Sequence, residues 1–426
     1  MTAVAGMVGR DGVALPRAVW PSELPRRLRR LTRAGRVADW LSAVSPSRNA
    51  HLMPSSVHRI GVLMQWGIGD AILATPLLRG LRAAYPNASI ELIGRPWLRE
   101  LFADTILADE VHELAPPWTR YRRKYRVWQP VWFAFLRELL RLRRVPFDVV
   151  ASVRCDPREV LQIRLLHARF RAGYGERAGR RWLDVDLGVP PHFVDGAHAS
   201  VAAARIAEAL TGSRGEARPW LPVPGRVVDA AVDALTEAGY TGGRIVAVCP
   251  YAGEGLREWN VRGFERVIEK LPAEVGFIVV IADPSRPVMP LRVPADRASL
   301  IWRTSLSELR GLLAITDLLI CNDSGVMHMA SACGCPAVAV FGPAPKSWFE
   351  PLGESNEVVI VEPMPCRPCF DLCIYRRPIC MEQIGPEMVS SAVARAFARL
   401  GPPRIGSRPA PVVNTQERNG REAYGG

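Results

Sequence analysis

A carboxylate beside two glycines is the first feature of this chain that could carry out chemistry. The apolar run RIGVLM leads into Gly67, Gly69 and Asp70 before a second apolar stretch. Two glycines let the backbone turn sharply and approach a ligand closely. They do not complete a dinucleotide-binding fingerprint, because Ile72 occupies the position of its third glycine. Asp70 could cap the helix that follows, or it could act as a general base that takes a proton from a hydroxyl group.

A second candidate site follows the apolar run LLIC, in the segment NDSGVMH. The residues of interest are Asn322, Asp323, Ser324, Gly325 and His328. We expect a helix to begin at Gly325, so that its first N–H groups and the Ser324 hydroxyl point toward one place. A helix N-terminus carries about half a positive charge and suits a diphosphate. His328 could reach the same anion, or it could lie partly buried with its hydrogen bonds satisfied within the fold.

Arg257 and a group of four cysteines offer two further kinds of chemistry. Arg257 lies in the loop YAGEGLREWN, where it could neutralise a phosphate or simply be solvated. The cysteines are Cys366, Cys369, Cys373 and Cys380. Four thiols permit a structural zinc or iron–sulfur site, although the spacing differs from that of common zinc ribbons. The alternative is a loop with reduced thiols, as expected for a cytoplasmic protein.

The elements that must position these residues alternate between short β-branched runs and amphipathic stretches. This alternation predicts an α/β protein whose parallel sheets are covered by helices. A proline-rich segment, Ala217–Arg226, interrupts it and predicts a linker. We expect a basic, amphipathic extension at 1–56, α/β domains at 57–220 and 221–400 with a ligand-binding cleft between them, and a disordered tail at 401–426.

The net charge of +13 is concentrated in two basic segments. Residues 1–58 contain nine arginines and three acidic residues, and residues 118–144 contain nine Lys or Arg and a single acid, Glu138. Apolar and aromatic residues accompany both segments, which suits an anionic membrane surface as well as a solvated helix face. No nucleic-acid-binding motif is present in the sequence, so we expect no nucleic-acid partner.

Several of these segments together resemble glycosyltransferase family 9, the ADP-heptose:lipopolysaccharide heptosyltransferases. The first predicted strand, Gly69-Asp70 and then ATPLLRGLRAAYP resemble the family's first motif. The block NDSGVMHMA, followed by GCPAVAVFGP, resembles its second. The segment DVVASVRCDPREVLQIRLLHARFRAGYGERAGRR and the cysteine-containing segment are also similar to family members. The resemblance extends from about Arg59 to Arg399.

The resemblance implies a GT-B fold, in which two Rossmann-like domains face a central cleft, the first binding the acceptor and the second a nucleotide sugar. It implies inverting transfer of heptose from ADP-heptose to a lipopolysaccharide inner-core acceptor, with no metal or cofactor required. Asp70 matches the position of the family's catalytic base. Ser324, Gly325 and His328 fall in the donor-binding block, and Arg257 stands where the family has a lysine.

The segment around Arg257 departs from the family pattern, because Tyr251, Glu258 and Asn260 replace a glycine, an arginine and a proline. Gly67 and Gly69 are expected on the acceptor side of the site. The leading hypothesis is a cytoplasmic enzyme that is peripheral on the inner face of the membrane and acts on a glycolipid. The alternatives are another nucleotide sugar, an acceptor other than lipopolysaccharide, or a non-catalytic protein that binds a sugar nucleotide or glycolipid.

Overall fold

The computed structural model describes most of the chain between residues 56 and 405. The described residues are 56–119, 130–175, 181–289, 291–295, 297–369, 371, 373–375 and 377–405. The predicted basic extension before residue 56, the basic residues 120–126 and the part of the predicted tail beyond residue 405 lie outside these residues.

The first half of the chain forms a six-stranded sheet in which every neighbouring pair is parallel, in the order β3-β2-β1-β4-β5-β6. The strands are β1 (Arg59–Met64), β2 (Ser89–Gly94), β3 (Glu110–Glu113), β4 (Phe147–Ser152), β5 (Ala168–Gly173) and β6 (Val185–Asp186). The helices are α2 (Ile68–Leu73), α3 (Thr75–Ala84), α4 (Leu98–Leu101), η1 (Pro117–Thr119), α5 (Pro130–Leu142), α6 (Pro157–Leu165), α7 (Pro191–Val194) and α8 (Ser200–Thr211).

The second half repeats this plan with a parallel sheet in the order β12-β11-β10-β7-β8-β9. The strands are β7 (Arg244–Cys249), β8 (Val275–Ile281), β9 (Ala298–Trp302), β10 (Leu318–Asn322), β11 (Ala337–Val340) and β12 (Glu357–Val359). The helices are α9 (Gly225–Glu237), η2 (Gly255–Arg257), α10 (Val261–Glu269), α11 (Leu306–Ile315), α12 (Gly325–Ala332), α13 (Lys346–Phe349), α14 (Ile379–Glu382) and α15 (Pro386–Phe397).

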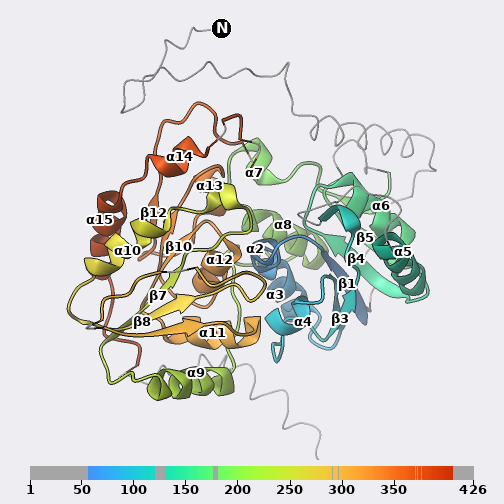
Figure 1. The fold of residues 1–426 in the computed structure, drawn as a ribbon. Coiled ribbons are helices and arrows are strands. Elements are labelled where there is room, and N and C mark those ends of the chain that lie inside the picture. The colour runs from blue at the N-terminus through green and yellow to red at the C-terminus, as the bar shows by residue number, and fades with distance from the viewer. Residues whose placement is uncertain are drawn as a thin grey trace, which may run out of the picture.

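Both sheets therefore share one doubly wound strand order. Counted from its own first strand, each sheet reads 3-2-1-4-5-6, with a crossover on either side of that strand. The two central strands of the second sheet, β7 and β10, are buried along their whole length, as expected for strands covered by helices on both faces. The fold confirms the predicted α/β class with two parallel-sheet domains (Figure 1).

The two domains touch through helices and through buried polar contacts. Figure 1 shows α2 of the first domain next to α12 of the second. On α11, the guanidinium of Arg310 donates to the carbonyl oxygens of Ala103 (2.7 Å) and of Pro222 in the linker (3.1 Å). Arg310 is completely buried. None of the helices described has the length and apolar character needed to cross a bilayer.

Candidate active site

The predicted site residues come together because they follow strands at the centre of each sheet. Asp70 lies beyond β1, and Arg154 follows β4, its neighbour in the first sheet. In the second sheet Arg257 follows β7, and Ser324 follows the neighbouring β10. Each pair flanks the point where the strand order reverses, and ligands of doubly wound sheets bind at that point.

Asp70 serves as a helix cap and also forms an ion pair. It lies in the first turn of α2, and its Oδ2 accepts a hydrogen bond of 2.9 Å from the backbone N–H of Gly67. Its Oδ1 accepts a hydrogen bond of 2.8 Å from Nη1 of Arg154. The side chain is 34% exposed, so a bound molecule has access to it. The two roles considered for Asp70 are therefore compatible, since each carboxylate oxygen can accept more than one hydrogen bond and the side chain is accessible.

Arg154 is held against an aromatic ring with a buried carboxyl group behind it. Its guanidinium lies 4.5 Å from the ring centroid of Trp66, a cation–π contact. The indole N–H of Trp66 donates to Glu159, which also accepts a hydrogen bond from the Ser152 hydroxyl. Burial raises the pKa of Glu159 to about 7, and the nearby Asp156 carboxylate adds to the increase. The Trp66–Glu159 contact thus fixes the ring on which Arg154 rests.

The N-terminus of α12 offers groups suited to an anion. The Ser324 hydroxyl is buried and has no hydrogen-bond partner among the described residues. Asn322, which precedes it, uses its amide within the protein, accepting from the Trp259 backbone N–H (3.0 Å) and donating to the Pro250 carbonyl (2.8 Å). Asn322 therefore links β10 to the loop after β7. Ser324 and the first N–H groups of α12 are left to face a ligand.

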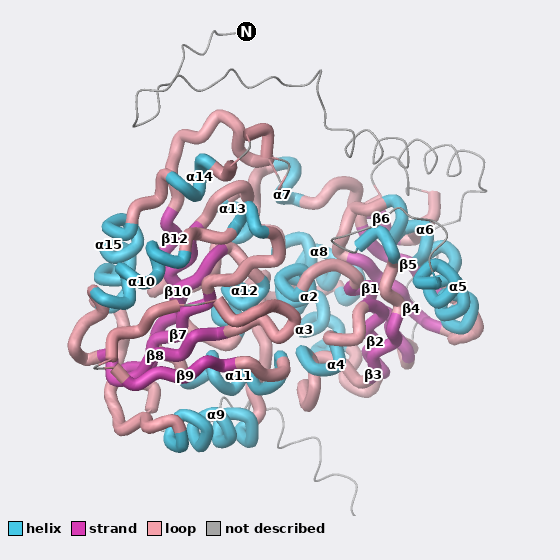
Figure 2. The backbone as a smooth tube through the Cα atoms, viewed as in Figure 1, coloured by secondary structure: helices cyan, strands magenta, loops and turns pink. Residues whose placement is uncertain are grey.

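Arg257 is paired rather than solvated. Its Nη1 donates to Asp323 at 3.2 Å, while Nε and Nη2 donate to the two oxygens of Asp371 at 2.8 and 2.6 Å. Burial raises the pKa of Asp323 to about 6; Arg257 opposes this effect, and Asp371 adds to it. Asp371 belongs to the long loop between β12 and α14 (Figure 2), so three separate chain segments meet at this guanidinium.

The two glycine-containing motifs make direct contact across the domain junction. A Cβ atom added to Gly69 would lie 2.7 Å from Cδ2 of His328, and one added to Gly325 would lie 3.0 Å from Cβ of Ile68. Both glycines are therefore needed for the close approach of α2 and α12. Burial lowers the pKa of His328 to about 3, and the neighbouring His198 contributes. A neutral His328 can hydrogen-bond a diphosphate but does not neutralise it.

The four cysteines of the loop before and within α14 lie near one another without forming a compact ligand set. Burial raises the pKa of the Cys369 thiol to about 11, and the sulfurs of Cys373, Cys366 and Cys380 contribute. Among the described residues, the group whose potential ligand atoms lie within 4.8 Å of one another is instead Glu91, Glu110 and His112. Glu91 there already accepts hydrogen bonds from Arg59 and His112. The metal site at the cysteines stays a prediction.

Four residues of this site were not predicted from the sequence. They are Trp66, Arg154, Glu159 and Asp371. Arg154 had a usable signal, because it follows the strand next to β1 and so lies at the same sheet edge as Asp70. Asp371 had none, since no periodicity places its loop beside Arg257.

Two doubly wound domains that meet at these loops define the GT-B class of fold. A family-wide sequence profile described as glycosyltransferase family 9 (heptosyltransferase) matches residues 163–377. The chain therefore belongs to glycosyltransferase family 9, as its motifs predicted.

Individual relatives show how far the similarity extends. Lipooligosaccharide heptosyltransferase 2 of Haemophilus influenzae is 22% identical over 314 residues, covering 68% of this chain and 85% of that protein. The Campylobacter jejuni protein of the same name is 30% identical over 94 residues, which are 22% of this chain and only 30% of that protein. The structure of E. coli ADP-heptose LPS heptosyltransferase II has a TM-score of 0.58 and 17% identity, covering 80% of this chain and 99% of that one.

Proposed function

We propose that the protein is an inverting glycosyltransferase that moves heptose from ADP-heptose onto a lipopolysaccharide inner-core acceptor. The observation that carries the proposal is the contact between α2 and α12, which brings the accessible Asp70 carboxylate to the helix N-terminus where Ser324 lies unpartnered. A base and an anion site are the two parts that such a transfer needs. ADP-heptose is named as the donor because the structural relative from E. coli is named for it and the family profile for heptosyl transfer.

The proposed reaction is a single displacement. Asp70 takes the proton of the acceptor hydroxyl as its oxygen bonds to the anomeric carbon, and the bond from that carbon to the diphosphate oxygen breaks. The bonding electrons leave with the nucleoside diphosphate, and the proton remains on Asp70. The N–H groups of α12, the Ser324 hydroxyl and Arg257 stabilise the charge that develops on the phosphates. One carboxylate suffices, because a diphosphate is a good leaving group, and no step uses a metal.

Donor binding is tested by thermal stabilisation with a set of nucleotide sugars. A ligand that binds only the folded state raises the melting temperature, by an amount that grows with its concentration relative to Kd. We expect ADP-heptose and ADP to stabilise the protein more than UDP- or GDP-sugars do. Stabilisation by a different nucleotide sugar would favour the first alternative. A donor that binds but never turns over with any acceptor would favour a non-catalytic binding protein.

The cysteine loop has a separate test. The proposed reaction needs no metal, so a zinc or iron–sulfur centre at Cys366, Cys369, Cys373 and Cys380 would be structural. Metal analysis of the purified protein, compared with a variant that carries Cys369→Ser and Cys373→Ser, decides whether a metal is bound there. A loss of metal in the variant with nucleotide binding unchanged is the expected sign of such a centre.

We further propose that the enzyme works at an anionic membrane surface, where a glycolipid acceptor resides, and that α5 contacts the lipids. Phe133, Leu136 and Leu140 are 68%, 53% and 50% exposed. A helix completes a turn every 3.6 residues, so these three side chains form one stripe that points away from the buried Phe135 and Leu139. An apolar stripe turned outward on a helix is typical of helices that lie in a membrane interface.

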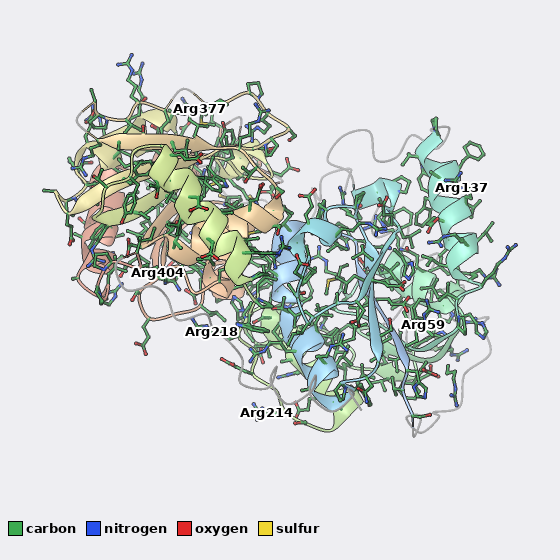
Figure 3. All side chains as sticks on the ribbon, turned by 90° about the horizontal axis from the view of Figure 1, so that it is seen from below. Arg59, Arg137, Arg214, Arg218, Arg377 and Arg404 are labelled. Atoms are coloured by element: carbon green, nitrogen blue, oxygen red, sulfur yellow. The ribbon has the colours of Figure 1, made fainter. Side chains whose placement is uncertain are left out.

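Arginines border this stripe. They are Arg137, Arg141, Arg143 and Arg144. Figure 3 shows Arg137 on α5 at the outer side of the first domain. Glu138 is the single acidic residue of the helix and pairs with Arg141 at 2.5 Å. This charge pattern favours anionic lipids over a neutral bilayer, because each Arg near such a surface contributes about 1 kcal/mol.

Flotation with vesicles tests the lipid contact. We expect binding to phosphatidylcholine vesicles only when phosphatidylglycerol is included, with weaker binding at high salt. Phe133→Ser combined with Leu140→Ser should abolish it, whereas Leu165→Ser, at an exposed leucine on α6, should leave it intact. Equal binding by both variants would contradict the assignment to α5. Formation of dimers by the wild type that the double variant lacks would assign the stripe to a second copy instead.

A further inference from the structure

Asp371 holds the donor-site arginine by a two-point contact from a backbone conformation that is unusual for an aspartate. Both oxygens of Asp371 accept hydrogen bonds from the Nε and Nη2 edge of Arg257. This edge is the face of a guanidinium that binds a phosphate in the same two-point manner. The φ angle of Asp371 is 64°, in the left-handed region that residues other than glycine rarely adopt.

The charges around Arg257 do not suit an anionic donor as they stand. Arg257 contacts Asp323 and Asp371, and Asp70 lies close enough to act on its charge. Asp70 has Arg154 as its own partner, so a nucleoside diphosphate brought to α12 would meet Asp323 and Asp371 with Arg257 alone to offset them. Binding is therefore favoured only if a carboxylate gives up its place on Arg257.

Asp371 is the carboxylate that is able to move. Asp323 is only 2% exposed and lies between β10 and α12, where its backbone N–H donates to Val340 of the neighbouring strand. Asp371 instead belongs to the loop between β12 and α14, whose described residues form no helix or strand. The loop is attached to the domain before Asp371, where the N–H of Cys369 donates to the carbonyl oxygen of Pro343.

We infer that Asp371 is a positioning residue that occupies the phosphate-binding edge of Arg257 in the empty enzyme and yields it to the donor diphosphate. The inference rests on the proposed function, because it assumes that a nucleoside diphosphate binds at α12. In the absence of the donor, Asp371 orients the guanidinium of Arg257 and keeps the loop bound to the domain. The exchange of one anion for another then couples donor binding to release of Asp371 from the domain.

The affinity of ADP tests the exchange. Asp371→Asn removes the competing charge, and asparagine tolerates the left-handed backbone as aspartate does. By isothermal titration at one pH and salt concentration, we expect this variant to bind ADP roughly three- to tenfold more tightly than the wild type. The matched control is Glu382→Gln, which removes an acidic group from α14 that pairs with Arg377 rather than Arg257. Unchanged or weaker ADP binding by Asp371→Asn overturns the inference.

Amide hydrogen exchange separates loop release from a simple change of charge. In the wild type, ADP should speed amide exchange in the peptide that contains Asp371, and in Asp371→Asn exchange in this peptide should already be fast without ADP. If ADP slows amide exchange in this segment of the wild type, or leaves it unchanged, the inference is wrong. If both proteins bind ADP with the same affinity and show the same amide exchange, Asp371 does not have this role, and the proposed function is unaffected. If neither protein binds ADP, the proposed function is wrong, and the inference that rests on it is wrong as well.

Discussion

Glu159 is a buried acid whose environment favours its protonated form. It accepts hydrogen bonds from Trp66 and Ser152, and burial raises its pKa to about 7. The folded protein therefore holds this proton more tightly than the unfolded chain, where the pKa is near 4.5. As the pH rises from about 4.5 through 7, the folded state loses that advantage, so this group lowers the free energy of unfolding across that window.

Glu159→Gln should remove this dependence on pH. Glutamine resembles the protonated acid and can still accept the Trp66 hydrogen bond. Relative to the wild type, the variant should gain stability between pH 5 and pH 8, by on the order of 1–3 kcal/mol. Urea unfolding of both proteins at the two pH values measures the difference. A stability difference that is the same at pH 5 and pH 8 would show that Glu159 does not titrate in this range.

At the scale of elements, the contact between α2 and α12 is what joins the two halves of the site. Gly69 lies against the His328 ring, and Gly325 lies against Ile68. A methyl group at Gly69 has no room unless the His328 ring or α2 shifts, and one at Gly325 requires Ile68 to move by a few tenths of an ångström. Overpacking of this kind costs about 1–3 kcal/mol.

Gly69→Ala should therefore lower transfer activity more than it lowers stability. We expect kcat to fall at least about tenfold, because a small separation of α2 from α12 moves Asp70 away from the donor. Gly215→Ala is the control, since a Cβ there meets nothing within 4 Å and its φ is not in the positive range. Steady-state kinetics and a melting curve for both variants provide the comparison. Full activity in Gly69→Ala would mean that the close contact is not needed.

The sequence patterns predicted the central elements well and the edges poorly. The apolar run RIGVLM forms β1 with those same bounds, Arg59–Met64, because a strand covered on both faces is almost entirely apolar. The edge strands β3, β6, β9 and β12 were not predicted, since most of their side chains are exposed or half-exposed and polar residues interrupt them. The proximity of Asp70, Ser324 and His328 could be predicted, because each lies just beyond the carboxyl end of a central strand. The loop that carries Asp371 was not, because it has no repeating pattern.

At the scale of the whole molecule, a buried arginine couples the domains. Arg310 on α11 reaches carbonyl groups of Ala103 in the first domain and Pro222 in the linker. Burial lowers its pKa, and carbonyl oxygens rather than a carboxylate accept its hydrogen bonds. Its energetic role is to satisfy buried backbone groups where the two domains and the linker meet.

Arg310→Met should weaken this junction. The variant leaves the two carbonyl groups without their donor, which costs about 1–3 kcal/mol for each buried group. We expect a melting temperature several degrees below that of the wild type. Arg303→Met, at an exposed arginine that also donates to a carbonyl, that of Pro284, should change it little. Equal melting temperatures for the two variants would show that Arg310 does not hold the domains together.

The proposed role of Asp70 as the base that activates the acceptor is tested most directly by the rate of ADP release from ADP-heptose in the presence of a heptose-accepting lipopolysaccharide core. Asp70→Asn keeps an oxygen that can accept the Gly67 N–H, so α2 should remain capped while the base is lost. We expect kcat to fall by about 10²- to 10⁴-fold while the Kd of ADP stays within about twofold of the wild-type value. An Asp70→Asn enzyme as active as the wild type would contradict it.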